Sequence, residues 1–432
     1  MPTPALLRAL RHRNYRLFIS GQLISRIGTW MQSVAESWLV YRLTGSAVLL
    51  GVVAFAGRVP ILLFSTVGGA VADRHHRHHI VIATQVASMC LAGLLAALTL
   101  TGVVAVWHLL AIAFALGVVN AFDIPARQAF VVQLVAREDL PNAIALNSMM
   151  FNGARVVGPA VAGVLVATVG EGWCFFANAV SYVAVLAGLL AIRLSRAERA
   201  DRPPSPWAQI VEGFRFVSGS RPIRALLLLL GLVSLMGTPY AVLMPIISDQ
   251  RFEAGARGLG ILMGAAGVGA LIGALRLANR TTLRGYGRSI GVAATGLGLS
   301  LVAFSAAPHF WLAAALLVPV GYAMMTQMAA TNTLIQSMVP DALRGRVMAI
   351  YSMMFMGMAP VGALLAGAVA ERLGAGATIA VGGLFCIGGG LALLWRLPGI
   401  RDEARRLILA QQAVTPHPGP ELPVSQSHPV SS

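Results

Sequence analysis

The sequence predicts an all-α membrane protein whose twelve transmembrane helices form two six-helix pseudo-repeats. Three observations lead to this fold class. The chain of 432 residues is 57% hydrophobic and only 11% charged, with a mean hydropathy of +0.76, which lies outside the range of soluble globular domains. Apolar runs of about 18 residues or more, long enough to cross a bilayer as a helix, recur along the chain. Part of the first half also recurs in the second.

The internal repeat is visible in one four-residue run and in the glycines around it. Ser-Met-Met-Phe occurs at 148–151 and again at 352–355. At the same offset, three glycines of the first half fall on glycines of the second half: Gly69 on Gly273, Gly158 on Gly362 and Gly163 on Gly367. The two halves are therefore expected to share one design.

Hydropathy and helix-breaking residues set the expected spans. The first half should cross the membrane at 16–41, 47–72, 80–101, 105–127, 142–168 and 174–194. The second half should cross it at 223–248, 257–278, 287–306, 309–335, 347–370 and 375–397. These spans divide the chain into a first bundle at 1–195, a cytoplasmic linker at 196–222, a second bundle at 223–398 and a disordered cytoplasmic tail at 399–432. Within the linker, 207–217 is amphipathic and is expected to lie on the membrane surface.

The basic residues determine the expected orientation. All 32 are arginine, the net charge is +16, and they cluster in alternate loops. The positive-inside rule then places both termini in the cytoplasm and the chain in the cytoplasmic (inner) membrane as a multi-pass protein. Because topology explains this charge, nucleic-acid binding is not expected. The three cysteines are scattered in apolar segments and are expected to pack in the core.

A polar stripe lies on the first expected helix. Its members follow one another in steps of four and three residues, so they share one face: Gln22, Arg26, Thr29, Ser33 and Glu36. Such a stripe inside a membrane span must face protein or a cavity. A lone carboxyl group away from water can take up and release a proton near neutral pH, so Glu36 is the candidate proton-coupling residue. The alternative is a structural ion pair, for example with Arg58 or Arg155.

The loop after the second span begins with a glycine and is rich in charge. Its sequence is Gly-Ala-Val-Ala-Asp-Arg-His-His-Arg, from residue 69 to residue 77. We expect Gly69 to let the helix end approach its neighbour, Asp73 to cap or pair, and Arg74 and Arg77 to anchor the loop as a gate. The alternative is a basic loop end without a gating role. The four histidines here and just beyond, His75, His76, His78 and His79, are expected to be solvated rather than metal-binding, because no complete ligand set accompanies them.

The end of the fourth span carries an acid and a base four residues apart. Asp123 and Arg127 can pair on one helix face, and Pro125 between them should end or kink the helix. Arg127 could instead meet Asp73, which would form a cytoplasmic latch.

The fifth span combines an arginine with helix breakers. Arg155 near mid-membrane must face protein or a cavity, while Gly158, Pro159 and Gly163 indicate a kinked helix packed closely on a partner. With Arg26 and Arg58 it would form a cationic cavity wall, opposite an adaptable wall that offers Gln327 and Asn332. Alternatively, these arginines pair internally and do not touch substrate.

These motifs resemble the major facilitator superfamily over nearly the whole chain. The loop at 69–78 is similar to its signature Gly-x-x-x-Asp-Arg-x-Gly-Arg-Arg, although His76 replaces a glycine. The run at 154–163 is similar to its antiporter signature on helix 5, with Ala154 and Ala162 in place of glycines. DIPARQ, LVAREDLPNAIALNS and GARVVGPAVAG are similar to the branch that contains the bacterial enterobactin exporter. The resemblance implies two bundles that alternate access around a central site.

The expected function is therefore proton-coupled efflux, by antiport, of a small amphiphilic organic molecule such as a siderophore. A multidrug or antibiotic exporter of the same branch, a lipid-like flippase and a non-transporting membrane sensor are the alternatives. The expected partners are the substrate, protons and the bilayer, and the chain is expected to be a monomer. No Walker A pattern, nucleophile–base set or metal-ligand cluster stands out, so neither an enzyme nor a cofactor is expected.

Overall fold

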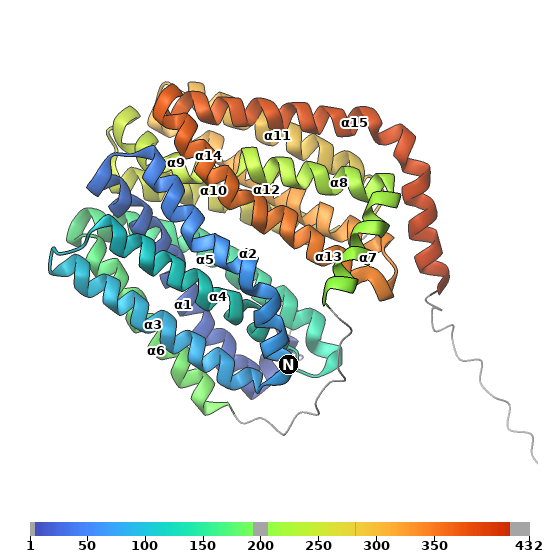
Figure 1. Cartoon of the computed structure of the whole chain (residues 1–432), viewed down its shortest axis with the longest axis horizontal. Helices are drawn as coiled ribbons and strands as arrows, with labels where there is room; N and C mark the ends of the chain where they lie inside the picture. Colours follow the sequence, from blue (N-terminus) through green and yellow to red (C-terminus); the bar gives the residue numbers. More distant parts are fainter. Residues whose placement is uncertain (1–4, 193–205, 281, 415–432) are drawn as a thin grey trace, which may run out of the picture.

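The computed structural model describes residues 5–192, 206–280 and 282–414, and nearly all of them are helical (Figure 1). No β-strand occurs within these ranges, which confirms the all-α class. Eleven helical runs of the described chain are long and apolar enough to cross a membrane. The first expected span, α1 (Arg13–Thr44), is 32 residues long but less apolar, because it carries the polar stripe. The arrangement is consistent with twelve spans.

The first half follows the expected spans closely. It contains a short 3-10 turn, η1, and six long helices. Their bounds are η1 (Ala5–Arg11), α1 (Arg13–Thr44), α2 (Ala47–Arg74), α3 (Arg77–Leu100), α4 (Val106–Val131), a second turn η2 (Arg137–Asp139), α5 (Leu140–Val169) and α6 (Glu171–Ala191). Pro125 does not end α4, which continues for six residues beyond it.

The second half repeats the pattern with more interruptions. Two of its spans contain π-helical turns, five-residue segments in which the helix widens. The bounds are α8 (Arg221–Leu232), η3 (Val233–Gly237), α9 (Tyr240–Ile246), η4 (Ile247–Arg251), α10 (Gly255–Ala278), α11 (Tyr286–Ala306), α12 (Phe310–Met338), α13 (Asp341–Ser352), η5 (Met353–Gly357), α14 (Met358–Leu373) and α15 (Ala375–Val414).

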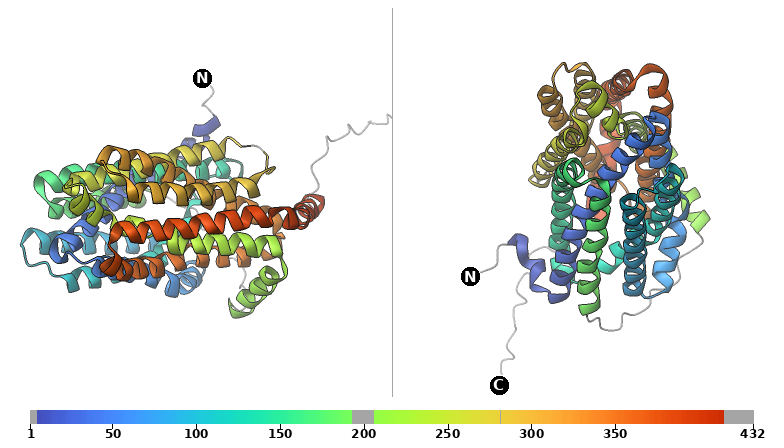
Figure 2. Two further views of the ribbon diagram at one scale, coloured as in Figure 1. Left: turned by 90° about the horizontal axis from the view of Figure 1, so that it is seen from above. Right: turned by 90° about the vertical axis from the view of Figure 1, so that its left-hand side faces the viewer.

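The two halves lie side by side: α3, α4 and α6 of the first half lie below α8, α11 and α15 of the second half in Figure 1, and Figure 2 shows the same two groups of helices from two further sides. The end of the molecule that holds η1 and the turn at 75–76 is here named the terminal end. The opposite end, which holds the turns at 45–46 and 252–254, is named the distal end.

The halves meet along two equivalent seams, α5 against α10 and α2 against α14. A Cβ added at Gly163 of α5 would lie 2.9 Å from the Cα of Gly260, and one at Gly367 of α14 would lie 2.5 Å from the Ala47 carbonyl oxygen. Each of these two repeat-related glycines therefore packs on the second long helix of the opposite half. Such close approach is available only to residues without a side chain, so the repeated glycines build a pseudo-symmetric interface.

The repeat also governs contacts inside each half. Gly158 approaches Trp30 of α1, and its counterpart Gly362 approaches Leu235 of η3. Because α1 and the α8–η3 span are each the first span of their half, these two glycines play the same packing role.

One expectation about the segments outside the bundles needs correction. The predicted disorder from 399 onward is wrong for residues 399–414, which continue α15 through Pro398. Ile400, Leu407 and Ile408 pack against the apolar core, and this burial stabilises the extension. The amphipathic piece at 207–217 forms α7 (Pro206–Gly219). The rest of the expected linker, at 196–205, and the rest of the tail, at 415–432, lie outside the described residues.

The cysteines also differ from expectation at one position. Cys174 and Cys386 are buried, as core packing requires, but Cys90 is exposed on the surface of α3. A helix on the outside of a membrane bundle is apolar on its outer face too, so hydropathy alone could not distinguish the two environments.

Candidate functional site

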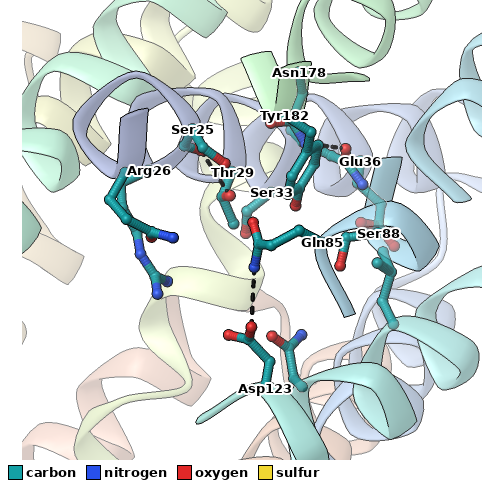
Figure 3. A pocket seen from close by; sticks show the side chains of 14 residues that line it. Ser25, Arg26, Thr29, Ser33, Glu36, Gln85, Ser88, Asp123, Asn178 and Tyr182 are labelled. Carbon is teal, nitrogen blue, oxygen red and sulfur yellow. Dashed lines mark hydrogen bonds between the residues drawn. The ribbon is translucent and has the colours of Figure 1, made fainter. Parts of the chain in front are cut away.

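A polar pocket lies inside the first half, enclosed by α1, α3, α4 and α6 (Figure 3). Its volume is about 130 Å³. All five members of the α1 stripe line it: Gln22, Arg26, Thr29, Ser33 and Glu36. The stripe therefore faces a cavity within the protein. Figure 3 shows Arg26 and Glu36 toward opposite sides of the pocket, with Thr29 and Ser33 between them.

Asp123 of α4 forms the wall opposite the stripe. It is only 4% exposed, and its Oδ1 accepts hydrogen bonds from the Thr84 hydroxyl and the Gln85 amide, both at 2.9 Å. Its Oδ2 accepts from the Arg127 Nε at 2.9 Å, and Arg26 lies near enough to attract it electrostatically. These donors satisfy both oxygens and favour an ionised carboxylate.

This geometry corrects the expectation of a surface latch. The predicted pairing of Asp123 with Arg127 is present, but Arg127 does not pair with Asp73. Asp123 instead belongs to the pocket, two helical turns inside α4.

Glu36 has a different environment from Asp123. It is partly buried, and within the described ranges no basic side chain forms an ion pair with it. The alternative expected from the sequence, an ion pair of Glu36 with Arg58 or Arg155, is therefore not found among the described residues. A carboxyl group without a counter-ion, away from bulk water, favours the protonated form and ionises only when the surroundings change. The pocket thus holds one paired acid and one unpaired acid.

Several pocket residues were not predicted from the sequence. Tyr182 of α6 lines the pocket near Thr29 and Ser88, and the Asn178 amide donates to the Gln32 Oε1 at 2.6 Å. Thr84, Gln85 and Ser88 share one face of an otherwise apolar helix, which is the signal that could have identified α3 as a wall.

The charged loop after α2 contains a local ion pair. Arg77 Nη2 lies 3.6 Å from Asp73 Oδ1, and Arg74 is exposed. The expectation for Gly69 is wrong: a Cβ there would meet nothing within 4 Å, whereas one at Gly68 would lie 2.1 Å from the Ala121 carbonyl oxygen. Gly68 is the glycine that permits the close approach of α2 and α4.

One of the four histidines near this loop contacts other helices, whereas His75, His76 and His79 are exposed. His78 stacks on Phe130 with the ring centroids 5.4 Å apart, and its Nε2 lies 2.9 Å from the Leu189 carbonyl oxygen. These contacts tie the terminal end of α3 to α4 and α6.

The helix-5 residues produce the close packing that their types predict. Gly158 faces α1 and Gly163 faces α10, while the carbonyl oxygen of Pro159 approaches Gly260. The helix continues through Pro159. The signature thus places α5 between its own half and the opposite half, where it can transmit movement from one to the other.

Arg58 and Arg155 lie outside the polar pocket, on helices that face the second half. Arg155 lies over the Trp30 ring at 5.7 Å and lies near the Tyr240 hydroxyl of α9. The cationic wall expected from Arg26, Arg58 and Arg155 is therefore divided: Arg26 serves the pocket, and the other two face the boundary between the halves.

Gln327 and Asn332 of α12 do not reach the pocket. Gln327 is 1% exposed, and among the residues that the structure describes its amide nitrogen has no hydrogen-bond partner. Asn332 accepts a hydrogen bond from the Gln336 amide at 2.6 Å. Asn332 thus makes a polar contact inside the second half.

Comparison with known proteins gives one consistent picture. The family model described as transmembrane secretion effector matches residues 5–424. The chain is 27% identical to the staphyloferrin A transporter of Staphylococcus aureus over 86% of this chain and 93% of that protein. It is 28% identical to the multidrug efflux pump Tap of Mycobacterium tuberculosis, over 92% and 95%. Against the enterobactin exporter EntS of Shigella boydii the identity is 25%, over 90% and 93%.

A solved structure shares the fold. The crystal structure of a POT family transporter in complex with 5-aminolevulinic acid superposes with a TM-score of 0.72 at 12% identity, over 90% of this chain and 96% of that one.

Proposed function

The chain belongs to the transmembrane secretion effector family of the major facilitator superfamily, and we propose that it exports a small amphiphilic organic molecule in exchange for protons. Like its relatives it is a membrane transporter of the efflux type rather than an enzyme.

The observation that carries the proposal is Glu36, a carboxyl group without an ion pair within the described ranges, in the polar pocket inside the first half. Asp123 accepts a hydrogen bond from Arg127, whereas Glu36 has no ion pair within the described ranges, so Glu36 is the acid of the pocket without a counter-ion. Proton uptake by Glu36 removes a charge that is costly to move within a low-dielectric bundle. A protonated Glu36 therefore favours one arrangement of α1 and an ionised Glu36 the other.

Contacts at the distal end indicate which end of the transporter is closed, and the arginines indicate which side of the membrane that end faces. The Tyr41 hydroxyl of α1 donates to Asp249 Oδ2 of η4 at 2.8 Å, and Gly163 and Gly367 close the seams on the same side. The terminal end has the arginine-rich turns, so the positive-inside rule assigns it to the cytoplasm. The chain then lies in the cytoplasmic membrane with both termini inside, and the present structure corresponds to the state closed to the outside.

The substrate class has two candidates among the relatives. The staphyloferrin A transporter and the enterobactin exporter favour a siderophore, and the Tap pump favours a drug. A lipid-like flippase and a non-transporting sensor are further outcomes that the following measurement distinguishes.

The test is proton movement in inside-out membrane vesicles that contain the protein. A panel of catecholate and carboxylate siderophores, cationic drugs and a lysophospholipid is added in turn. We expect at least one compound to dissipate the pH gradient with wild type and not with Glu36→Gln, while Glu138→Gln, the same change at an exposed surface site, behaves as wild type. Proton movement unaffected by Glu36→Gln would refute the role of Glu36, and none with any compound would refute coupled export.

A further inference from the structure

We propose that Arg58 and Arg155 form a two-arginine clamp for an organic anion, so that the exported molecule carries at least two oxyanion charges on an aromatic or apolar body. This inference rests on the proposed export function and names its substrate class. Because both groups of the clamp are positively charged, an anionic substrate is favoured over a cationic drug.

Arg58 lies on the face of α2 that meets the second half. A Cβ at Gly51, two turns before it, would lie 2.6 Å from the Ala363 carbonyl oxygen, and one at Gly357 would lie 3.1 Å from Leu62 Cδ1. Gly51, Arg58 and Leu62 follow one another in steps of seven and four residues, so they share one helix face. Arg58 therefore lies at the boundary between α2 and the α14 span, and its side chain is exposed there.

Arg155 approaches the same boundary from α5. A Cβ at Gly267 of α10 would lie 2.8 Å from the Arg155 carbonyl oxygen. The guanidinium contacts Trp30 of the first half and Tyr240 of the second. Arg155 is thus held between the halves by an aromatic ring on one side and a hydroxyl on the other.

The positive charges of Arg58 and Arg155 interact unfavourably, and within the described ranges neither guanidinium forms an ion pair with an acid. The spans α10, α11 and α12 contain no Asp or Glu. Asp123, the other acid well inside the spans besides Glu36, is already held by Arg127. Two neighbouring positive charges within a membrane bundle are costly without compensation, and a bound dianion supplies it.

The surrounding groups indicate the rest of the ligand. Trp30 packs edge-on against Phe151, with the ring centroids 5.8 Å apart, and these rings can contact an apolar or aromatic body. Arginine binds carboxylate and catecholate oxygens through paired N–H donors, which lysine does not match. A lipophilic monocation would meet two like charges at the same place and is disfavoured.

The test measures ligand binding to the purified protein in detergent, without any pH gradient. Tryptophan fluorescence and calorimetry report the binding. The probes are isophthalate, its neutral dimethyl ester and the cation tetraphenylphosphonium. We expect wild type to prefer isophthalate to both other probes. Arg58→Gln and Arg155→Gln should each weaken isophthalate binding about tenfold to a hundredfold, the effect of losing one charge-assisted hydrogen bond.

Two further variants keep the test decisive. Arg257→Gln removes an exposed arginine of α10 and should bind isophthalate like wild type. Arg155→Lys keeps the charge but loses the paired donors, so its affinity should lie between those of wild type and Arg155→Gln. Equal binding of the diester and the dianion, tighter binding of the cation by wild type, or no loss in either glutamine variant would overturn the clamp. Binding is measured without a proton gradient, so its result does not depend on the proposed coupling. If the protein binds isophthalate and releases no proton to the buffer, the proposed coupling is refuted and the clamp stands.

Discussion

Replacing Gly163 by alanine should open the distal end of the transporter. The added Cβ would lie 2.9 Å from the Gly260 Cα and 3.2 Å from two carbonyl oxygens of α10, at Ala256 and Arg257. Carbon atoms pack best at about 3.5–4.0 Å, and the obstructing atoms are backbone, which cannot rotate away. Overpacking of this kind costs about 1–3 kcal/mol. Since about 1.4 kcal/mol changes an equilibrium tenfold, the closed state should lose about fivefold to a hundredfold in population relative to the open one.

The assay is the distance between spin labels placed across the distal end, at Thr101 after α3 and Leu373 at the end of α14. Both positions are exposed and belong to different halves. Native Cys90 is exposed and must be replaced first. We expect Gly163→Ala to transfer population from the short to the long distance.

The matched control is Gly153→Ala on the same helix, where a Cβ meets nothing within 4 Å. It should leave the distance distribution unchanged. If Gly163→Ala folds and gives the wild-type distribution, then the α5–α10 seam does not govern closure, and the interpretation of the repeated glycines is wrong.

Three further outcomes follow from individual contacts. Tyr41→Phe removes the hydrogen bond to Asp249, which should favour distal opening by about 1.5 kcal/mol, measured with the same spin labels; an unchanged distribution would exclude this contact as a latch. Asp123→Asn leaves Arg127 without its partner and should destabilise the purified protein by about 3 kcal/mol. The double variant with Arg127→Gln should recover part of this stability. An unfolding temperature of Asp123→Asn equal to that of wild type would contradict the role of the ion pair. Deleting residues 399–432 should lower thermal stability because 399–414 cover apolar core, whereas deleting 415–432 should not; equal effects would contradict this packing.

The sequence predicted the helical architecture well because membrane burial leaves clear patterns. Long apolar runs defined the spans, and the internal repeat identified Gly158 and Gly163 as contact positions before any contact was known. The polar stripe on α1 was equally informative, since Glu36 and its neighbours cannot face lipid. In each case a strong physical constraint acts on the local sequence itself.

Other features depend on contacts between distant segments and could not be predicted in this way. Gly68 and Gly69 differ by about 100° in helix direction, so the sequence could not decide which of the two faces α4. Nothing local distinguishes an Asp123 at the membrane surface from one that accepts bonds from α3. Residues 399–414 are charged enough to suggest disorder, and only their contact with the core shows why they remain helical.

The central claim is that Glu36 couples proton movement to export, and counterflow in proteoliposomes tests it most directly. Glutamine resembles the protonated carboxyl group, so Glu36→Gln should still alternate between its states and exchange labelled for unlabelled substrate. The same variant should lose accumulation of substrate driven by a pH gradient. Retained exchange with lost gradient-driven accumulation is the predicted result. Gradient-driven accumulation equal to that of wild type would contradict the claim.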